Sequence, residues 1–444
     1  MFFADRGTRN IPGISTDTKA RPINKVAIIG AGTMGSGIAM CFANAGINAM
    51  LIDVNEEGLQ RGLDSIDANY SSRVKRGRMT EDKKTSVMSL IQGATSISSA
   101  ADADMVIEAV FEDMDLKKSI FKELESITRP GTILGTNTST LNINEIANSI
   151  SRPEDVIGLH FFSPANIMPL LEIIRTDSSS EETLRTSMNI AAKIRKTPVL
   201  ARVCYGFIGN RMMEGYAREA EAMVLEGALP RTIDDALEKE FGMAMGILAV
   251  FDMAGVDVGT KIHIANAEQY PPDPTYYQAD FALVEAGHLG QKNGRGYYRY
   301  EKGDRNRYDD ADAVEILRTR ARELGIPQRN DHTTNEIIER CLFPLINEGI
   351  KILEEGVAIR AADIDVVWTS GYGFPRHLGG PMFYADSIGL KTVYDGILKY
   401  REKFGPMHWE PASLLKKLVS EGKSLKDWEA AQTLPTKPAG ADKA

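Results

Sequence analysis

The chain has 444 residues, of which 43% are hydrophobic and 25% are charged, and its formal net charge at pH 7 is -9. This length predicts about three domains, and the composition excludes a disordered polymer and a polytopic membrane protein. The acidic balance argues against a nucleic-acid partner and against an anionic membrane surface, because phosphate groups would repel the average surface of the protein. An anionic ligand therefore requires a local basic patch.

The cysteine content predicts the compartment. Cys41, Cys204 and Cys341 are far apart and form no C-x-x-C pair, which excludes a disulfide scaffold and a zinc site and favours a reducing compartment; we expect no metal. The first residues, MFFADRGTRN, lack the features of a signal peptide, and the last residues, GADKA, are not a peroxisomal tripeptide. We therefore expect a cytoplasmic protein.

Short apolar runs dominate the first half of the chain. Residues 1–22 lack periodicity and are interpreted as a leader or linker. Residues 23–203 then alternate short runs rich in β-branched residues with helical stretches, which predicts one α/β domain on a mainly parallel sheet. The predicted strands are residues 25–30, 49–53, 104–108, 133–135, 156–161, 170–174 and 199–203.

The second half is mainly helical and repeats itself. A shift of 129 residues superimposes five pairs of identical residues, and a shift of 134 residues superimposes three more. The pairs are Arg211 and Arg340, Glu226 and Glu355, Gly227 and Gly356, Asp234 and Asp363, Gly242 and Gly371, Gly246 and Gly380, Asp252 and Asp386, and Gly255 and Gly389. We therefore predict two copies of a mainly α-helical domain, residues 204–300 and 333–430, joined by a linker over 301–332 and followed by a tail over 431–444.

A glycine-rich turn directly follows the first predicted strand. Gly30, Gly32 and Gly35 open a helical stretch together with Thr33 and Met34, and Asp53 ends the second strand. Glycines at this spacing let a pyrophosphate approach the helix N-terminus, and the acidic residue can bind a ribose diol. The pattern predicts a Rossmann-type NAD-binding domain with all six residues at the cofactor. NAD is favoured over NADP because the Asp53 carboxylate would repel a 2′-phosphate.

A histidine and a glutamate provide a candidate base. His160 lies at the carboxyl end of a predicted strand, where ligands bind in open α/β sheets, and Glu172 lies in the next apolar run. A carboxylate in such a run is costly to bury without a partner, and His160 is its natural partner. The pair would orient the imidazole and stabilise its charged form when it takes an alcohol proton.

Several ordered motifs add a family resemblance over residues 23–430. They are GAGTMGSGIA, VIEAVFEDMDLKKSIF, TNTSTL, GLHFFSPANIMPLLEII, GFIGNRMM and LGQKNGRGYY. With these motifs the chain resembles the L-3-hydroxyacyl-CoA dehydrogenases, specifically the dehydrogenase half of multifunctional fatty-acid β-oxidation enzymes.

The resemblance implies roles for individual residues. His160 would be the general base, oriented by Glu172, while Ser139 would contact the substrate oxygen and the nicotinamide region and Asn210 would bind the reacting oxygen. The other cofactor contacts that it implies are Val110, Phe111, Glu112, Lys117 and Lys292.

Two positions depart from the family pattern. Ser163 stands where the family often has an asparagine beside the nicotinamide, and a tyrosine that some relatives use near the substrate falls on Ser370, with Tyr372 close by. In the second helical copy Glu339 stands in the place of Asn210, so we expect that copy to support structure rather than chemistry.

One basic segment is a candidate for the local basic patch that an anionic ligand requires. It runs from Arg73 to Arg78 and continues at Lys83 and Lys84. Its charge suits the phosphates of CoA, and the resemblance implies that Arg76 and Asn69 contact CoA. A solvated helix end is an equally good interpretation.

The resemblance implies NAD-dependent oxidation of L-3-hydroxyacyl-CoA to 3-oxoacyl-CoA in fatty-acid β-oxidation, and we expect the substrate between the α/β domain and the first helical copy. The alternatives are reductive 3-hydroxybutyryl-CoA chemistry, action on a free sugar acid, and a catalytically silent NAD-binding scaffold subunit. In single-copy relatives the helical domain forms a homodimer interface, so the second copy predicts a monomer with an intramolecular pseudo-dimer. An association with a hydratase or a thiolase stays open.

Overall fold

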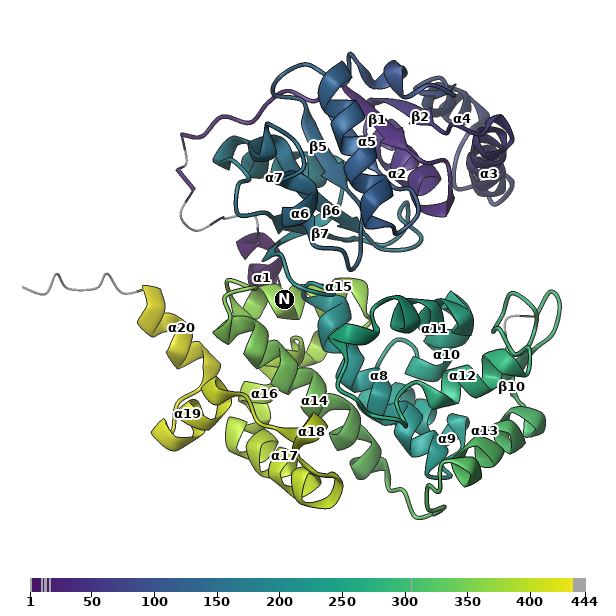
Figure 1. Ribbon diagram of the computed structural model, residues 1–444, viewed down its shortest axis with the longest axis vertical. Helices are drawn as coiled ribbons and strands as arrows, with labels where there is room; N and C mark the ends of the chain where they lie inside the picture. Colours follow the sequence, from purple (N-terminus) through teal and green to yellow (C-terminus); the bar gives the residue numbers. More distant parts are fainter. Residues whose placement is uncertain (1, 9–10, 12–13, 16, 305, 434–444) are drawn as a thin grey trace, which may run out of the picture. The chain divides into compact units, whose positions relative to one another are not determined.

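The computed structural model describes residues 2–8, 11, 14, 15, 17–304 and 306–433, and the chain divides into two compact units (Figure 1). The first unit contains Met1–Ile208 and Gly356–Gly371, and the second contains Gly209–Glu355 and Tyr372–Ala444. Among the described residues, no helix has the length and apolar character needed to cross a membrane.

Eight strands of the first unit form one sheet in the order β3-β2-β1-β4-β5-β6-β7-β8. All neighbouring strands are parallel except β6 and β7, which run antiparallel. The strands are β1 (Lys25–Ile29), β2 (Asn48–Ile52), β3 (Ile91–Ala94), β4 (Met105–Glu108), β5 (Ile133–Thr136), β6 (Val156–Phe161), β7 (Leu170–Arg175) and β8 (Thr197–Arg202). The α/β domain on a mainly parallel sheet is thereby confirmed.

The strand β3 has no counterpart among the predicted strands. It lies at the edge of the sheet, where it pairs with β2 alone, and of its four residues only Ile91 is buried. An edge strand of this kind has no apolar run, and periodicity therefore could not identify it. The central strand β4, in contrast, is buried along its whole length.

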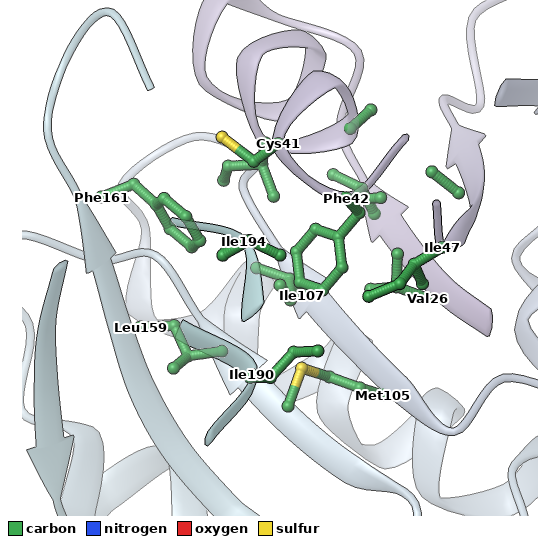
Figure 2. Packing of buried hydrophobic residues seen from close by; sticks show 14 of the residues in the cluster. Val26, Cys41, Phe42, Ile47, Met105, Ile107, Leu159, Phe161, Ile190 and Ile194 are labelled. Atoms are coloured by element: carbon green, nitrogen blue, oxygen red, sulfur yellow. The ribbon is translucent and has the colours of Figure 1, made fainter. Parts of the chain in front are cut away.

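Helices cover both faces of the sheet. They are α2 (Thr33–Asn44), α3 (Glu56–Lys75), α4 (Glu81–Met88), α5 (Met114–Ile127), α6 (Ile143–Ala147) and α7 (Glu181–Lys193). Figure 2 shows Phe42 of α2 and Ile190 of α7 in one hydrophobic cluster with Ile107 of β4. The next residue, Glu108, points to the opposite face because side chains alternate along a strand. That face carries α5, from which Lys117 contacts Glu108.

Two further helices belong to the first unit. These are α1 (Phe2–Gly7), within the predicted leader, and α15 (Ala361–Gly371), from the second helical copy. The Arg360 side chain before α15 donates a hydrogen bond of 2.7 Å to the Gly7 carbonyl of α1. The segment leading to α15 also extends the sheet edge, because the Val357 carbonyl accepts a 2.9 Å hydrogen bond from the Arg202 amide of β8.

The second unit is mainly helical. It contains α8 (Gly209–Leu225), α9 (Pro230–Asp235), α10 (Ile247–Ala254), α11 (Val256–Ala265), α12 (Gln278–Glu285), α13 (Ala311–Glu323), α14 (Thr334–Glu354), α16 (Pro381–Ile388), α17 (Leu390–Phe404), α18 (Pro406–Trp409), α19 (Ser413–Glu421) and α20 (Leu425–Thr433), with a small hairpin of β9 (Tyr298–Tyr300) and β10 (Arg307–Asp309). The hairpin strand β10 and α13 lie within the predicted linker over 301–332.

The predicted repeat recurs as repeated local structure. Asp252 accepts hydrogen bonds from the consecutive amides of Tyr297 and Tyr298, and its counterpart Asp386 accepts them from the consecutive amides of Leu425 and Lys426. Gly255 and its counterpart Gly389 each separate two successive helices, with φ of 98° and 88°. A side chain would be strained there, which explains why both copies have glycine.

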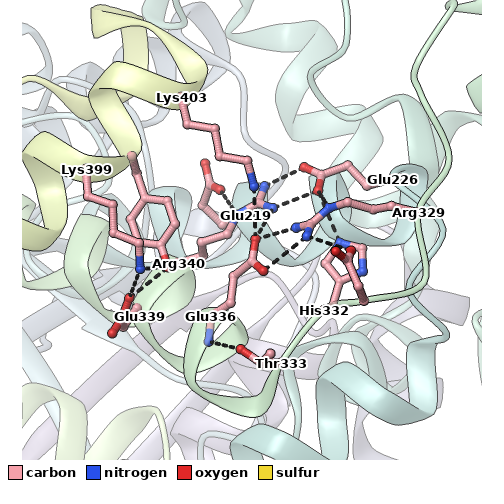
Figure 3. Close-up of polar contacts among 12 residues, drawn as sticks. Glu219, Glu226, Arg329, His332, Thr333, Glu336, Glu339, Arg340, Lys399 and Lys403 are labelled. Carbon is pink, nitrogen blue, oxygen red and sulfur yellow. Dashed lines mark hydrogen bonds and ion pairs between the residues drawn. The ribbon is translucent and has the colours of Figure 1, made fainter.

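Ion pairs connect the two copies through α8 and α14. Arg340 of α14 binds both Glu226 oxygens at 2.7 and 2.9 Å and Glu219 at 2.9 Å, as part of the polar cluster in Figure 3. Arg211 of α8 binds the equivalent residues, Glu355 at 2.6 and 2.8 Å and Glu348 at 2.8 Å. A contact in which residue i meets j while the copy of j meets the copy of i is the pattern of a two-fold interface.

Candidate active site

The glycine-rich turn is shaped for a phosphate group. Gly30 has a φ of 102°, and a Cβ there would lie 2.6 Å from the Ala109 carbonyl oxygen, whereas a Cβ on Gly32 would meet no atom within 4 Å. Gly32 is also the N-cap of α2 and provides no side-chain cap, so the first amides of that helix, at Thr33, Met34 and Gly35, have no side chain to satisfy them. Open space in front of uncapped amides fits the pyrophosphate of a dinucleotide.

Asp53 lies beside this turn, at the end of β2. One of its oxygens accepts a 3.0 Å hydrogen bond from the Ala31 amide of the turn, and the other accepts a 3.0 Å bond from the Asn55 amide. The side chain is only half-buried, and each carboxylate oxygen can accept a second hydrogen bond. Asp53 therefore retains acceptor capacity for ribose hydroxyls.

The candidate base lies in the antiparallel pair of strands. His160 of β6 stands directly opposite Glu172 of β7, and its Nδ1 lies 2.7 Å from Glu172 Oε2. Glu172 is fully buried, and its other oxygen accepts a 3.3 Å hydrogen bond from the Ile208 amide. With both carboxylate oxygens engaged, Glu172 fixes the imidazole through Nδ1 and leaves Nε2 as the nitrogen that can take a proton.

Phenyl rings surround this histidine. The ring centroids of Phe162 and Phe207 lie 4.5 and 5.6 Å from that of His160. They limit the access of water, and His160 is only 6% exposed. The imidazole therefore has little contact with solvent.

The loop of Ser139 follows β5 and is held by Glu112. One oxygen of Glu112 accepts hydrogen bonds from the Thr138 hydroxyl at 2.5 Å and from the amides of Ser139 at 2.9 Å and Thr140 at 3.2 Å. Burial acts to raise the pKa of Glu112, but the charge of Lys117 and these hydrogen bonds outweigh it and hold the pKa below its ordinary value. Glu112 is therefore a carboxylate at neutral pH.

A second contact joins this loop to the histidine strand. The Asn137 side chain accepts a 2.9 Å hydrogen bond from the Phe161 amide, next to His160. Because β4, β5 and β6 are adjacent and parallel, the residues after them meet at one sheet edge. The first unit thus brings together Ser139, His160, Ser163, Val110, Phe111 and Glu112. Sequence reasoning gave no role to Asn137, although this residue lies within the TNTSTL motif.

Four of the predicted cofactor contacts differ in exposure. Phe111 is 85% exposed and Ser163 is also exposed, so both are open to a ligand. Lys117 is 1% exposed and pairs with Glu108 at 2.7 Å, so its ammonium group already has a partner. Lys292, in the second unit, forms an ion pair with Asp257.

Asn210 lies in the first turn of α8 in the second unit. Its Oδ1 accepts a 2.7 Å hydrogen bond from the Tyr372 hydroxyl, and the ring of Tyr372 occupies the space in which a Cβ on Gly209 would lie. Ser370, the position expected for a tyrosine, is buried in α15. The tyrosine that contacts the candidate substrate residue is thus Tyr372, which comes from the second helical copy.

The basic segment lies at the end of α3 and the start of α4. Arg73, Lys75, Arg76 and Arg78 are exposed, whereas Lys84 pairs with Asp67 at 2.7 Å. Asn69 is exposed on the same helix and contacts Asn166, which follows β6, at 3.5 Å. Among the described residues, no group of three or more histidine, cysteine, aspartate or glutamate side chains is placed to hold a metal ion.

Family models match both units. The model of the 3-hydroxyacyl-CoA dehydrogenase NAD binding domain matches residues 25–204. The model of the 3-hydroxyacyl-CoA dehydrogenase C-terminal domain matches two segments, residues 206–300 and 337–428. The two segments confirm the predicted repeat of a helical domain.

Curated relatives and solved structures agree with these matches. The peroxisomal bifunctional enzymes of Homo sapiens and Danio rerio are 39% and 40% identical over 98% and 91% of this chain, which covers 62% and 57% of those proteins. The chain thus spans about three fifths of the length of these relatives. The 3-hydroxybutyryl-CoA dehydrogenase of Escherichia coli has a TM-score of 0.78 at 28% identity, covering 90% of this chain and 100% of that one. The dehydrogenase part of multifunctional enzyme 1 from C. elegans has a TM-score of 0.69 at 30% identity, covering 94% and 96%.

The relatives correct the predicted location. The expectation of a cytoplasmic protein is wrong, because the relatives from Homo sapiens and Danio rerio are named peroxisomal and the one from Brassica napus is named glyoxysomal, which points to the peroxisome. Unpaired cysteines and an acidic surface suit any reducing compartment. Composition therefore had no means of separating the peroxisomal matrix from the cytoplasm.

Proposed function

The chain belongs to the 3-hydroxyacyl-CoA dehydrogenase family, and from this membership we propose that it oxidises L-3-hydroxyacyl-CoA to 3-oxoacyl-CoA with NAD, reversibly, in fatty-acid β-oxidation. The observation that carries the proposal is the buried contact of 2.7 Å between His160 and Glu172 in the same sheet as the open glycine turn. A base and a dinucleotide site together are the two requirements for oxidising an alcohol.

In this reaction His160 Nε2 takes the hydroxyl proton of the substrate. Glu172 favours that step because its carboxylate stabilises the imidazolium that results. Bound NAD supplies the chemistry of hydride acceptance. In the reverse direction the same imidazolium returns its proton to the ketone oxygen, and the neutral donors Ser139 and Asn210 orient that oxygen without adding charge.

The residues at the cofactor site fit NAD. Gly32 leaves room for the pyrophosphate, while Gly30 and Gly35 lie too close to neighbouring backbone to carry side chains. Thr33 and Met34 begin the uncapped helix, and Asp53 would bind the ribose. A 2′-phosphate on that ribose would face the Asp53 carboxylate and be repelled, which disfavours NADP. Val110, Phe111, Glu112, Lys117, Ser163 and Lys292 complete the proposed set of cofactor contacts.

The basic segment is the proposed site of the CoA phosphates. Arg76 and its neighbours are exposed and positive on a chain whose average charge is negative, and Asn69 lies on the same helix. Guanidinium groups bind phosphate through paired hydrogen bonds. Acyl-CoA is therefore the proposed substrate, and a hydratase that makes 3-hydroxyacyl-CoA is the proposed functional partner.

The test follows the absorbance of the reduced nicotinamide in the presence of acetoacetyl-CoA and either NADH or NADPH. Rapid loss with NADH, and much slower loss with NADPH, is the expected result. Acetoacetate without CoA serves as a control, because turnover of the free acid would favour a hydroxy-acid dehydrogenase. Measurable NADH binding without any turnover would instead favour a silent NAD-binding subunit. Comparison with longer 3-oxoacyl chains then separates a 3-hydroxybutyryl-CoA dehydrogenase from an enzyme for long chains.

For the oligomeric state we propose a monomer in which the two helical copies form a pseudo-dimer. The support is the reciprocal pairing of Arg211 with Glu355 and of Arg340 with Glu226. Gly215 and its counterpart Pro344 lie against each other, since a Cβ on Gly215 would be 2.9 Å from the Pro344 Cβ. Contact between equivalent residues marks the two-fold axis of such an interface. Light scattering should give the mass of one chain, and a dimer that persists on dilution would contradict the proposal.

A further inference from the structure

The face of the sheet that carries α5 contains a buried ion pair at the edge of the site. Glu108 ends the central strand β4 and is fully buried, and Lys117 in the first turn of α5 is 1% exposed. The Lys117 ammonium lies 2.7 Å from Glu108 and 3.4 Å from Glu112. We infer that Glu108 is a positioning residue, which acts through Lys117 and Glu112 to hold the loop of Ser139 in its working position. The inference rests on the proposed function, since that function makes the position of Ser139 matter.

The hydrogen bonds of Glu108 leave it little freedom. One oxygen accepts from Lys117 and from the Val110 amide, both at 2.7 Å, and the other accepts from the Thr136 hydroxyl at 2.7 Å. A buried carboxylate with three good donors is a rigid anchor. Two of these donors belong to the chain segments that lead into the loops of Glu112 and Ser139.

A buried lysine at the position of Lys117 requires acidic partners. A cation in the first turn of a helix is disfavoured by the positive end of the helix dipole, and burying it removes its hydration as well. Glu108 and Glu112 offset both costs. In return the ammonium separates two carboxylates that would otherwise repel each other, and it keeps Glu112 ionised.

Glu112 connects the buried ion pair to the loop of Ser139. Its oxygen Oε1 accepts from the amides of Ser139 and Thr140 and from the Thr138 hydroxyl. The same Thr138 hydroxyl oxygen accepts a 3.0 Å hydrogen bond from the Leu141 amide. The loop is thus organised around a single carboxylate, and a neutral or displaced Glu112 would release it. The Glu108 side chain touches none of these loop atoms itself. It reaches them through Lys117 and Glu112, and through the Thr136 hydroxyl, which accepts a 3.3 Å hydrogen bond from the Thr138 amide.

The decisive variant replaces both members of the pair, as E108L/K117M. Removing one member alone would leave a buried charge and unfold part of the domain, whereas apolar replacement of a whole buried pair is often neutral for stability. We expect a folded protein with a lowered melting temperature, because the Val110 amide and the Thr136 hydroxyl lose their acceptor. We also expect kcat for acetoacetyl-CoA reduction to fall by about 10- to 100-fold, the cost of a small misplacement in an active site.

A matched control comes from the next residue of the same helix. Lys118 pairs with Glu145 at 2.9 Å, and their side chains are 28% and 52% exposed. The corresponding double variant, K118M/E145L, removes the same kinds of groups from the surface. It should keep the wild-type kcat and the wild-type loop.

Two readouts separate positioning from a structural role. Amide hydrogen exchange of the peptide that contains residues 137–141 should be faster in E108L/K117M than in the control. In an S139A background the loss of kcat caused by E108L/K117M should shrink to about twofold or less. The reason is that the pair would act by positioning the Ser139 hydroxyl, which S139A has already removed.

Each outcome decides the question. Wild-type exchange and wild-type kcat in E108L/K117M would show that the pair only stabilises the fold. A loss of kcat that persists in full in the S139A background would show that Lys117 acts elsewhere. An inactive wild-type protein would refute the proposed function instead, and the exchange of residues 137–141 would then decide the inference alone.

Discussion

Replacing Arg340 by methionine should strongly destabilise the helical unit. The guanidinium is 1% exposed, and it binds Glu226 and Glu219 (Figure 3). Methionine keeps much of the length of arginine but removes the charge. Two carboxylates from the other helical copy would then lose a buried partner.

The pKa of Glu226 gives the magnitude of the stability that Arg340 and its neighbours provide. Burial acts to raise it, but hydrogen bonds and charge from Arg340, with further hydrogen bonds from Arg329 and His332, lower it from 4.5 to about 2. That difference corresponds to about 3.4 kcal/mol of stability at neutral pH. In R340M, Arg329 and His332 still stabilise the Glu226 carboxylate in part, while the Glu219 carboxylate also loses its partner. We therefore expect the free energy of unfolding to decrease by about 3 kcal/mol, as for other broken buried pairs.

The counterpart Arg211 provides a matched control. Its side chain is 18% exposed and its partner Glu355 is 48% exposed, so R211M removes a pair close to the surface. Such pairs contribute about 1 kcal/mol or less. Urea unfolding at pH 7 measures both variants, with tryptophan fluorescence as the signal because Trp409 is buried in this unit.

The pH dependence gives an independent check. A lowered pKa in the folded state gives stability that is present above the unfolded value of 4.5 and is lost as the pH falls toward about 2. At pH 3 the contribution of Glu226 falls to about 1.4 kcal/mol, so the gap between wild type and R340M should narrow. Equal losses for R340M and R211M at pH 7, or a gap that stays constant down to pH 3, would refute the reasoning.

Three further predictions concern the candidate site. H160A should lower kcat about 10²- to 10⁴-fold in the NADH assay while NADH affinity stays within about twofold; unchanged turnover would remove His160 from the mechanism. D53S should raise the KM for NADH and narrow the preference over NADPH, because the repulsion of a 2′-phosphate is lost; an unaltered ratio of kcat/KM values would contradict that role. Y372F keeps the ring packed on Gly209 but removes the hydrogen bond to Asn210, so kcat should fall about tenfold at unchanged melting temperature, and no fall in an N210A background would confirm that Tyr372 acts through Asn210.

The sequence predicted those features that depend on local pattern. Gly30, Gly32 and Gly35 identify the dinucleotide turn because Gly30 has a positive φ, Gly35 packs against the Gly30 backbone, and Gly32 leaves open space for a ligand. His160 and Glu172 were expected to pair because a carboxylate in an apolar run needs a partner, and the structure places them opposite each other. The helical repeat was predicted from identical residues in the same order, at a shift of 129 and then of 134 residues.

Features that depend on long-range contacts were not accessible. Glu108 ends an apolar run just as Glu172 interrupts one, so the same signal was present, but nothing local identifies Lys117 as its partner. Tyr372 was noticed only as a neighbour of Ser370, since its contact with Asn210 joins residues 162 positions apart. The edge strand β3 lacks apolar alternation because only one of its residues is buried.

Arg211 and Arg340 each bind glutamates of the other helical copy, so the two copies have complementary surfaces. A chain that opened between its copies would present a surface complementary to the matching half of a second chain, which is the geometry of domain swapping. The covalent connection opposes that exchange, because it raises the effective concentration of each copy relative to the other. In the proposed monomer, the second copy would turn an association that depends on protein concentration into a property of one molecule. In the second copy Glu339 stands at the position of Asn210, and its carboxylate binds Tyr400 and Lys399.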